Sequence, residues 1–166
     1  MQWALARFDR AGLELPRVES ITFTRFSDYC ADLDGLAIPS EGDHRNAEWG
    51  VVLCLSEDEV CDDPGCARYN TAVKRTVLHE LAHVWMEQFV PEPTKAAFMS
   101  WRGLQTWDGH ATDWARSAAE HGAEFITWGL LGSGYAMVEV GLPSVDERVT
   151  GFQLLTGRQP LQPTAD

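Results

Sequence analysis

The chain has 166 residues, of which 45% are hydrophobic and 23% are charged. This length predicts one domain over residues 1–166, large enough to bury its own core without a structural metal or a disulfide. The formal net charge of −12 would repel nucleic-acid phosphates and anionic membrane surfaces, so neither is expected as a partner.

The first twelve residues, MQWALARFDRAG, predict a short amphipathic helix that ends at Gly12. They lack the basic start and the continuous apolar run of a signal peptide. We therefore expect a cytoplasmic protein, unless a targeting segment has been removed from this chain.

Three strands are expected next. Residues 20–26 (SITFTRF) alternate β-forming and polar side chains, as a half-buried strand does. Residues 35–39 (GLAIP) and 49–55 (WGVVLCL) are joined by a polar loop and are expected to form a hairpin. Because the last segment is almost entirely apolar, it is expected to be the central strand, covered on both faces.

Four cysteines, Cys30, Cys54, Cys61 and Cys66, lie in the first half of the chain. A Pro-Gly turn in CDDPGC would bring Cys61 close to Cys66, which makes a disulfide one alternative. A cytosolic compartment would keep that pair reduced. A zinc cluster of Cys54, Cys61 and Cys66 is not favoured, because the sequence has no CxxC pair.

The second half of the chain predicts helices. Apolar side chains recur at helical spacing over residues 70–89, and the prolines of VPEPT end that helix. A short helix over 94–101 and a longer one over 113–131 are expected to follow. The glycines at Gly151 and Gly157, with two prolines after them, indicate an irregular C-terminal end. The order of elements predicts an α+β fold with one small sheet.

The stretch TVLHELAHVW within the first of these helices places His79 and His83 four positions apart, with Glu80 between them. Successive helical residues turn by about 100°, so the two histidines lie within about 40° of each other. They can hold one Zn²⁺, and Glu80 can take a proton from a water molecule beside it. The alternative is an accidental pair of surface histidines.

A catalytic zinc needs a third protein ligand. The extended motif HExxHxxGxxH is excluded because Phe89 stands where it requires histidine. Glu120 and Glu124, four positions apart in SAAEHGAEFITWGL, supply two carboxylates on one helix face. One can bind the metal while the other accepts the ring N–H of a liganding histidine. The alternative is a helix with two exposed acids.

HELAH followed by an E-x-x-A-E helix resembles the gluzincin zinc metallopeptidases, above all their lethal-factor-like and minimal members. The resemblance covers residues 70–131 and implies a zincin-like fold, with Glu120 as the third ligand and Glu124 orienting a histidine. EHGAEFITWGL is also similar to segments of uncharacterised actinobacterial proteins. The thermolysin-type signature has asparagine where this chain has Ala119, so its contact with the substrate backbone does not carry over.

The resemblance also implies an oxyanion-stabilising residue near the glutamate helix, and His110 is the nearest candidate, with Tyr135 as the other. His110 is equally an ordinary loop histidine, and His121 is expected at the surface or behind the ligands. The sequence thus predicts a zinc metallopeptidase acting on a peptide or protein, with Glu80 as general base. Two alternatives stay open: an amidohydrolase acting on a non-peptide amide, and a regulatory or binding protein that retains the zinc site.

Overall fold

The computed structural model describes residues 2–25, 34–40, 44–55, 72–107, 114–131, 137 and 140–161. Within these residues the fold is α+β, as predicted, with five α-helices and a three-stranded sheet. In chain order the elements are α1 (Gln2–Arg10), β1 (Val18–Arg25), β2 (Gly35–Pro39), β3 (Trp49–Leu55), α2 (Ala72–Phe89), α3 (Glu92–Arg102), a 3-10 turn (Trp114–Arg116), α4 (Ala118–Leu131) and α5 (Val145–Thr156).

The sheet has the strand order β1-β3-β2. β3 lies in the centre, parallel to β1 and antiparallel to β2. The predicted hairpin and the central position of the most apolar strand are therefore confirmed. Its expected burial on both faces is confirmed in part, because Val51 and Leu53 are buried on one face, while on the opposite face Cys54 is buried and Val52 is only half-buried.

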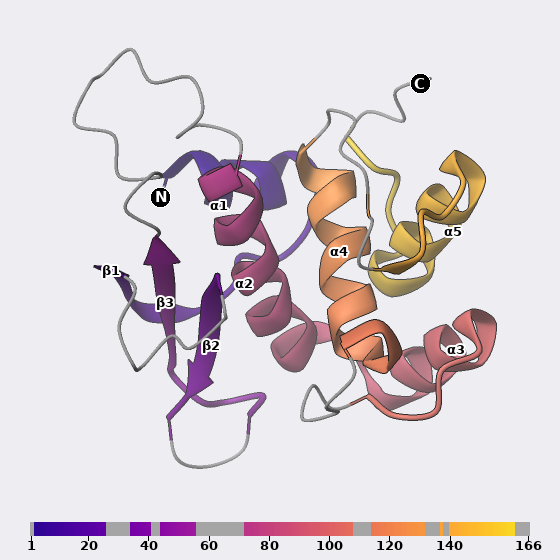
Figure 1. Ribbon diagram of the computed structural model, residues 1–166, viewed down its shortest axis with the longest axis horizontal. Helices are drawn as coiled ribbons and strands as arrows, with labels where there is room; N and C mark the ends of the chain where they lie inside the picture. Colours follow the sequence, from indigo (N-terminus) through magenta and orange to yellow (C-terminus); the bar gives the residue numbers. More distant parts are fainter. Residues whose placement is uncertain are drawn as a thin grey trace.

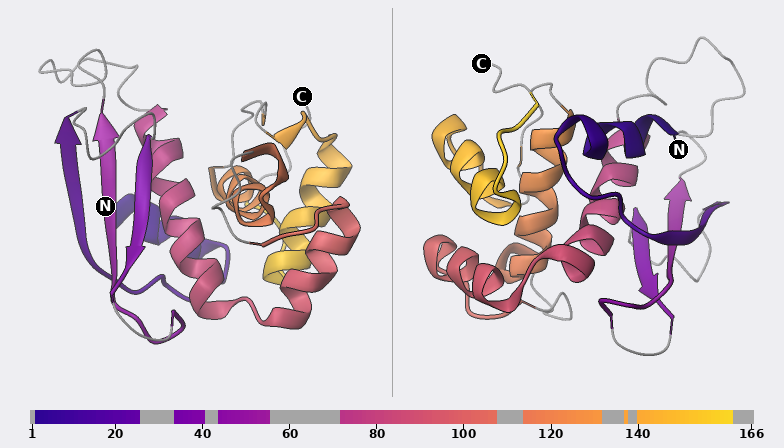
Figure 2. Two further views of the ribbon diagram at one scale, coloured as in Figure 1. Left: turned by 60° about the horizontal axis from the view of Figure 1, so that its bottom comes forward. Right: turned by 180° about the vertical axis from the view of Figure 1, so that it is seen from behind.

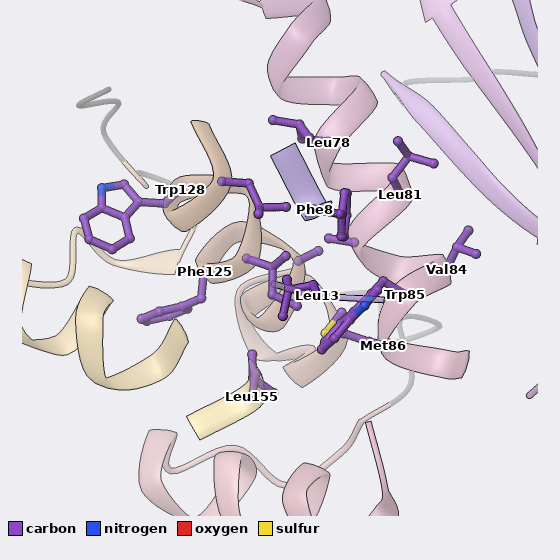
Figure 3. Packing of buried hydrophobic residues seen from close by; sticks show 14 of the residues in the cluster. Phe8, Leu13, Leu78, Leu81, Val84, Trp85, Met86, Phe125, Trp128 and Leu155 are labelled. Atoms are coloured by element: carbon purple, nitrogen blue, oxygen red, sulfur yellow. The ribbon is translucent and has the colours of Figure 1, made fainter. Parts of the chain in front are cut away.

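Helix α2 lies between the sheet and the helices α3, α4 and α5 (Figure 1; Figure 2). Because α2 has neighbours on two sides, it buries apolar residues such as Leu78, Leu81 and Val84. Its partner on the side away from the sheet is α4, which in turn packs against α5. Figure 3 shows the apolar side chains of these helices together with Phe8 from α1. Among the described residues, none of the helices combines the length and apolar character needed to cross a membrane.

The C-terminal region differs from the sequence-based expectation of an irregular end. Ser144 and Glu147 form a reciprocal capping box that begins α5, and Gly157 ends it with a left-handed backbone (φ 66°). Gly151 lies inside this helix because a Cβ there would stand 2.3 Å from the Phe125 ring of α4. What the sequence suggested as a helix breaker is thus a close contact between two helices.

The helix expected over 113–131 is also divided. Ser117 separates the 3-10 turn from α4 because it forms an isolated parallel bridge with Thr106. The backbone N–H of Ala118 donates to the carbonyl of Thr106, at 3.1 Å. This pairing fixes the start of α4 relative to the segment that follows α3.

Candidate metal centre

Helices α2 and α4 pack side by side and bring three Lewis-basic atoms together. His79 Nε2 lies 3.0 Å from Glu120 Oε2, His83 Nε2 lies 3.3 Å from the same oxygen, and the two Nε2 atoms are 3.1 Å apart. Around a tetrahedral zinc with bonds of about 2.0–2.1 Å, neighbouring ligand atoms stand about 3.3 Å apart. The triangle therefore has the size that one small metal ion requires, and these three residues form a cluster that could hold one.

The other ring nitrogen of His79 fixes which atom of that ring is available to a metal. His79 Nδ1 lies 3.1 Å from Glu124 Oε1, and an ionised carboxylate only accepts hydrogen bonds. Nδ1 therefore carries a proton and donates a hydrogen bond to Glu124. In the neutral ring Nε2 then presents a lone pair toward Glu120 and His83, which leaves room for a cation among three acceptors.

The electrostatics of the cluster agree with a site built for positive charge. Burial alone lowers the pKa of His79, but hydrogen bonds to Glu120 and Glu124 outweigh it and raise that pKa to about 10. Burial raises the pKa of Glu120, yet its hydrogen bonds to His79 and His83 bring it down to about 2. Without a metal, the cluster therefore retains a proton on His79 as its cation.

The burial of the two glutamates excludes the alternative of a surface helix with two exposed acids. Glu120 and Glu124 are 8% and 1% exposed. His79 is also buried, whereas the side chain of His83 keeps 17% of its surface exposed. The cluster is therefore closed on the Glu124 side and reaches solvent through His83, where a further ligand can approach.

Glu80 lies beside the cluster, between α2 and the edge strand β2. Glu80 is buried, and a Cβ added to Gly35 would stand 2.7 Å from both Cγ and Oε1 of Glu80. Burial raises the pKa of Glu80, while the nearby charges of His79 and His83 oppose that rise. A carboxylate with a raised pKa is better able to accept and release a proton near neutral pH.

His121 is neither exposed nor part of the cluster. It is buried, with Nε2 2.9 Å from the carbonyl of Ala115 and Nδ1 3.3 Å from Nε of Arg102. Because the guanidinium can only donate, Nδ1 accepts and Nε2 carries the proton. Of the two positions expected for His121, the surface is wrong, and its hydrogen bonds to Arg102 and Ala115 tie the start of α4 to α3 instead of supporting a ligand residue.

Several predicted residues lie outside the described residues, namely His110, Tyr135, Cys30, Cys61 and Cys66. Their proposed roles stay predictions. The fourth cysteine, Cys54, is buried in β3 and disulfide-bonded. Its sulfur is therefore not a thiolate available to a zinc cluster.

Two residues of this site were not identified from the sequence. Arg75 Nη2 donates to Glu124 Oε1 at 3.0 Å, and its position four residues before His79 was a usable signal, because such residues share a helix face. Gly35 makes room for Glu80, and no local sequence signal identifies it.

Comparison with protein-family models, curated proteins and solved structures found no match for this chain. What is concluded about its function therefore rests on the geometry and electrostatics of the site.

Proposed function

We propose that this protein is a zinc-dependent metallopeptidase of gluzincin type, with His79, His83 and Glu120 as metal ligands. The observation that carries the proposal is the convergence of two imidazole nitrogens and one carboxylate oxygen at 3.0–3.3 Å. Two histidines and one glutamate are a donor set of catalytic zinc sites, which leave one position for water or substrate. The same donor types also suit iron(II), so metal analysis is part of the test.

When bound, zinc would supply Lewis-acid chemistry by lowering the pKa of water and polarising the scissile carbonyl. Glu80 accepts the proton from the attacking water and then passes it to the nitrogen of the leaving amine. Burial supports this role because it raises the pKa of Glu80. Glu124 keeps His79 in the Nδ1–H tautomer, so that Nε2 stays available to the metal.

The edge of the sheet supports a peptide as substrate. Among the strands that the structure describes, β2 is the outer one, beside β3. The N–H of Cys54 donates to the carbonyl of Asp34 at 2.9 Å, and the N–H of Ser40 donates to the carbonyl of Glu48 at 2.7 Å. Hydrogen bonding alternates along an antiparallel pair, so the even-numbered residues of this segment direct their backbone groups toward β3.

Gly35 and Ala37 consequently direct their N–H and C=O groups to the outer edge of the sheet. Pro39, the next residue in that series, has no N–H to leave unpaired, which suits an edge strand. An extended peptide can add to this edge through main-chain hydrogen bonds. Since Gly35 lies against Glu80, a peptide bound there would run past the proposed base. A small non-peptide amide would make no use of this edge.

The test combines metal analysis with cleavage of a peptide mixture followed by mass spectrometry. We expect about one zinc per chain, lost in His79→Ala and His83→Ala. Glu80→Gln should keep its zinc and its fold, because glutamine preserves size and helix propensity. Its turnover should fall about 10²–10⁴-fold, the contribution of a general base.

The outcomes separate the alternative functions. Wild-type turnover in zinc-loaded Glu80→Gln would refute Glu80 as the base. Cleavage of small amides but not of peptides would favour an amidohydrolase. If Glu80→Gln reproduces the full cellular effect of wild type, the protein is a binding or regulatory module. Comparing the proteomes of cells that carry either version identifies the substrate of a peptidase.

A further inference from the structure

Arg75 lies on the face of α2 that carries the two histidines, one turn before His79. Its Nη2 atom is 3.0 Å from Glu124 Oε1, and the same oxygen is 3.1 Å from His79 Nδ1. Arg75, Glu124 and His79 thus form a continuous chain of hydrogen bonds. It ends at the His79 ring, whose Nε2 is one of the three converging metal-ligand atoms. A second helix, α4, supplies only the middle member of that chain.

Glu124 depends on this arrangement because it is nearly inaccessible to water, with 1% of its surface exposed. A buried carboxylate without a charged or hydrogen-bonding partner is strongly unfavourable. Arg75 brings a permanent positive charge and remains partly exposed, with 32% of its side-chain surface accessible. It can therefore compensate the buried charge of Glu124 without being fully desolvated itself.

We propose that Arg75 is a positioning residue of the metal centre, which holds the Glu124 carboxylate so that His79 directs Nε2 at the metal. This inference rests on the metal site of the proposed function but not on peptide hydrolysis. Losing the arginine would remove a charged partner that fixes the Glu124 carboxylate, so Oε1 would no longer be held opposite His79 Nδ1. His79 would then lose the acceptor that fixes its ring orientation and tautomer.

The competing interpretation is an ion pair that only joins α2 to α4. Such a partly exposed pair would contribute little to the free energy of unfolding and would not affect metal binding. Arg75 also carries a positive charge, which by itself repels a metal cation. The two interpretations therefore predict different changes in metal affinity. Removing the arginine weakens metal binding if Arg75 positions Glu124, and leaves metal binding equal or stronger if it does not.

The experiment measures zinc affinity by chelator competition in Arg75→Gln, Arg75→Lys and a matched control, Lys74→Met. Lys74 is the neighbouring cation on the same helix and lies over the Trp3 ring, at 5.7 Å. We expect Arg75→Gln to bind zinc about 10–100-fold more weakly, as removal of other outer-shell partners does. Arg75→Lys should recover part of this loss, and Lys74→Met should bind like wild type.

Two further measurements distinguish positioning from general stability. The visible absorption spectrum of the cobalt(II)-substituted protein should change in Arg75→Gln and not in Lys74→Met, because it reports ligand geometry. In a Glu124→Gln background, Arg75→Gln should weaken zinc binding by less than about twofold, since both changes interrupt the same chain. If Arg75→Gln fails to fold alone, the double variant should restore folding by removing the buried charge that has lost its arginine partner.

Unchanged or tighter zinc binding in folded Arg75→Gln would overturn the proposal. So would a double variant that stays unfolded, or an additive loss of affinity in the Glu124→Gln background. A wild type that binds zinc without cutting peptides would remove the proposed function and leave this inference standing. A wild type that binds no metal would remove both.

Discussion

The two halves of α4 are equally buried but differ in what they bury. Its first half carries Glu120, His121 and Glu124, and each has partners among the described residues. Its second half, from Phe125 onward, is almost entirely apolar. There a Cβ on Gly129 would stand 2.1 Å from the Phe152 ring of α5.

This difference separates the part of the helix that serves chemistry from the part that stabilises the fold. Buried charges are costly even when they are paired, and apolar residues of similar volume often stabilise as well or better. Apolar packing of the second half contributes stability directly. We therefore expect substitutions in the first half to change metal binding, and substitutions in the second half to change the free energy of unfolding.

Glu120→Ala and Glu124→Ala test the first half from within. Removing Glu120 deletes a proposed ligand, and we expect zinc affinity to fall by more than the roughly 10–100-fold expected for Glu124→Ala. Isothermal titration or chelator competition measures both. Equal losses, or a larger loss in Glu124→Ala, would reverse the assignment of the two glutamates.

Phe125→Ala tests the second half. Phe125 is fully buried, and its ring lies 5.8 Å from that of Phe98 and 5.7 Å from that of Trp101. Truncating such a side chain costs about 3–5 kcal/mol of unfolding free energy. Urea denaturation should show this loss while the folded variant keeps wild-type zinc affinity. A large fall in affinity without a fall in stability would contradict the division of α4.

Gly151→Ala should produce a smaller loss of stability at the same interface. The added methyl group would stand 2.3 Å from the Phe125 ring, so α4 and α5 must move apart. Overpacking of this kind costs about 1–3 kcal/mol. Gly50→Ala is the control, because the atom nearest to its added Cβ is at an ordinary distance of 3.5 Å and its backbone is not left-handed. Thermal melts that show no loss for Gly151→Ala would argue against this close contact.

Gly35→Ala tests whether the sheet places the proposed base. The methyl group would overlap the Glu80 side chain, which has to shift, while the metal ligands on α2 and α4 are untouched. We expect turnover to fall about tenfold with zinc content unchanged, since small displacements of reacting groups are costly. Gly50→Ala in β3 is the control, because its Cβ meets only ordinary contacts, the nearest at 3.5 Å. Equal turnover in both variants would show that Gly35 does not restrict Glu80.

Local periodicity and spacing were enough to predict the strands, the hairpin and the helix that carries His79. They also placed Glu120 and Glu124 on one face, which is how both reach His79. Tertiary contacts could not be predicted in this way. Gly151 suggests a broken helix until the Phe125 ring packed against it is known, although the capping signal of Ser144 and Glu147 was present in the sequence. Likewise, nothing local indicates that Gly35 adjoins Glu80.

The disulfide bond of Cys54 has a consequence for where the protein can exist in this form. Disulfides persist in oxidising compartments, whereas the cytosol reduces them. In the cytoplasm, the location expected from the sequence, Cys54 would instead be a thiol at the end of the central strand. The N–H of that residue donates to Asp34, directly before Gly35. The residue whose side chain changes with the redox state of the compartment is therefore hydrogen-bonded to the segment that borders Glu80, and thiol-specific labelling of the native protein reports that state.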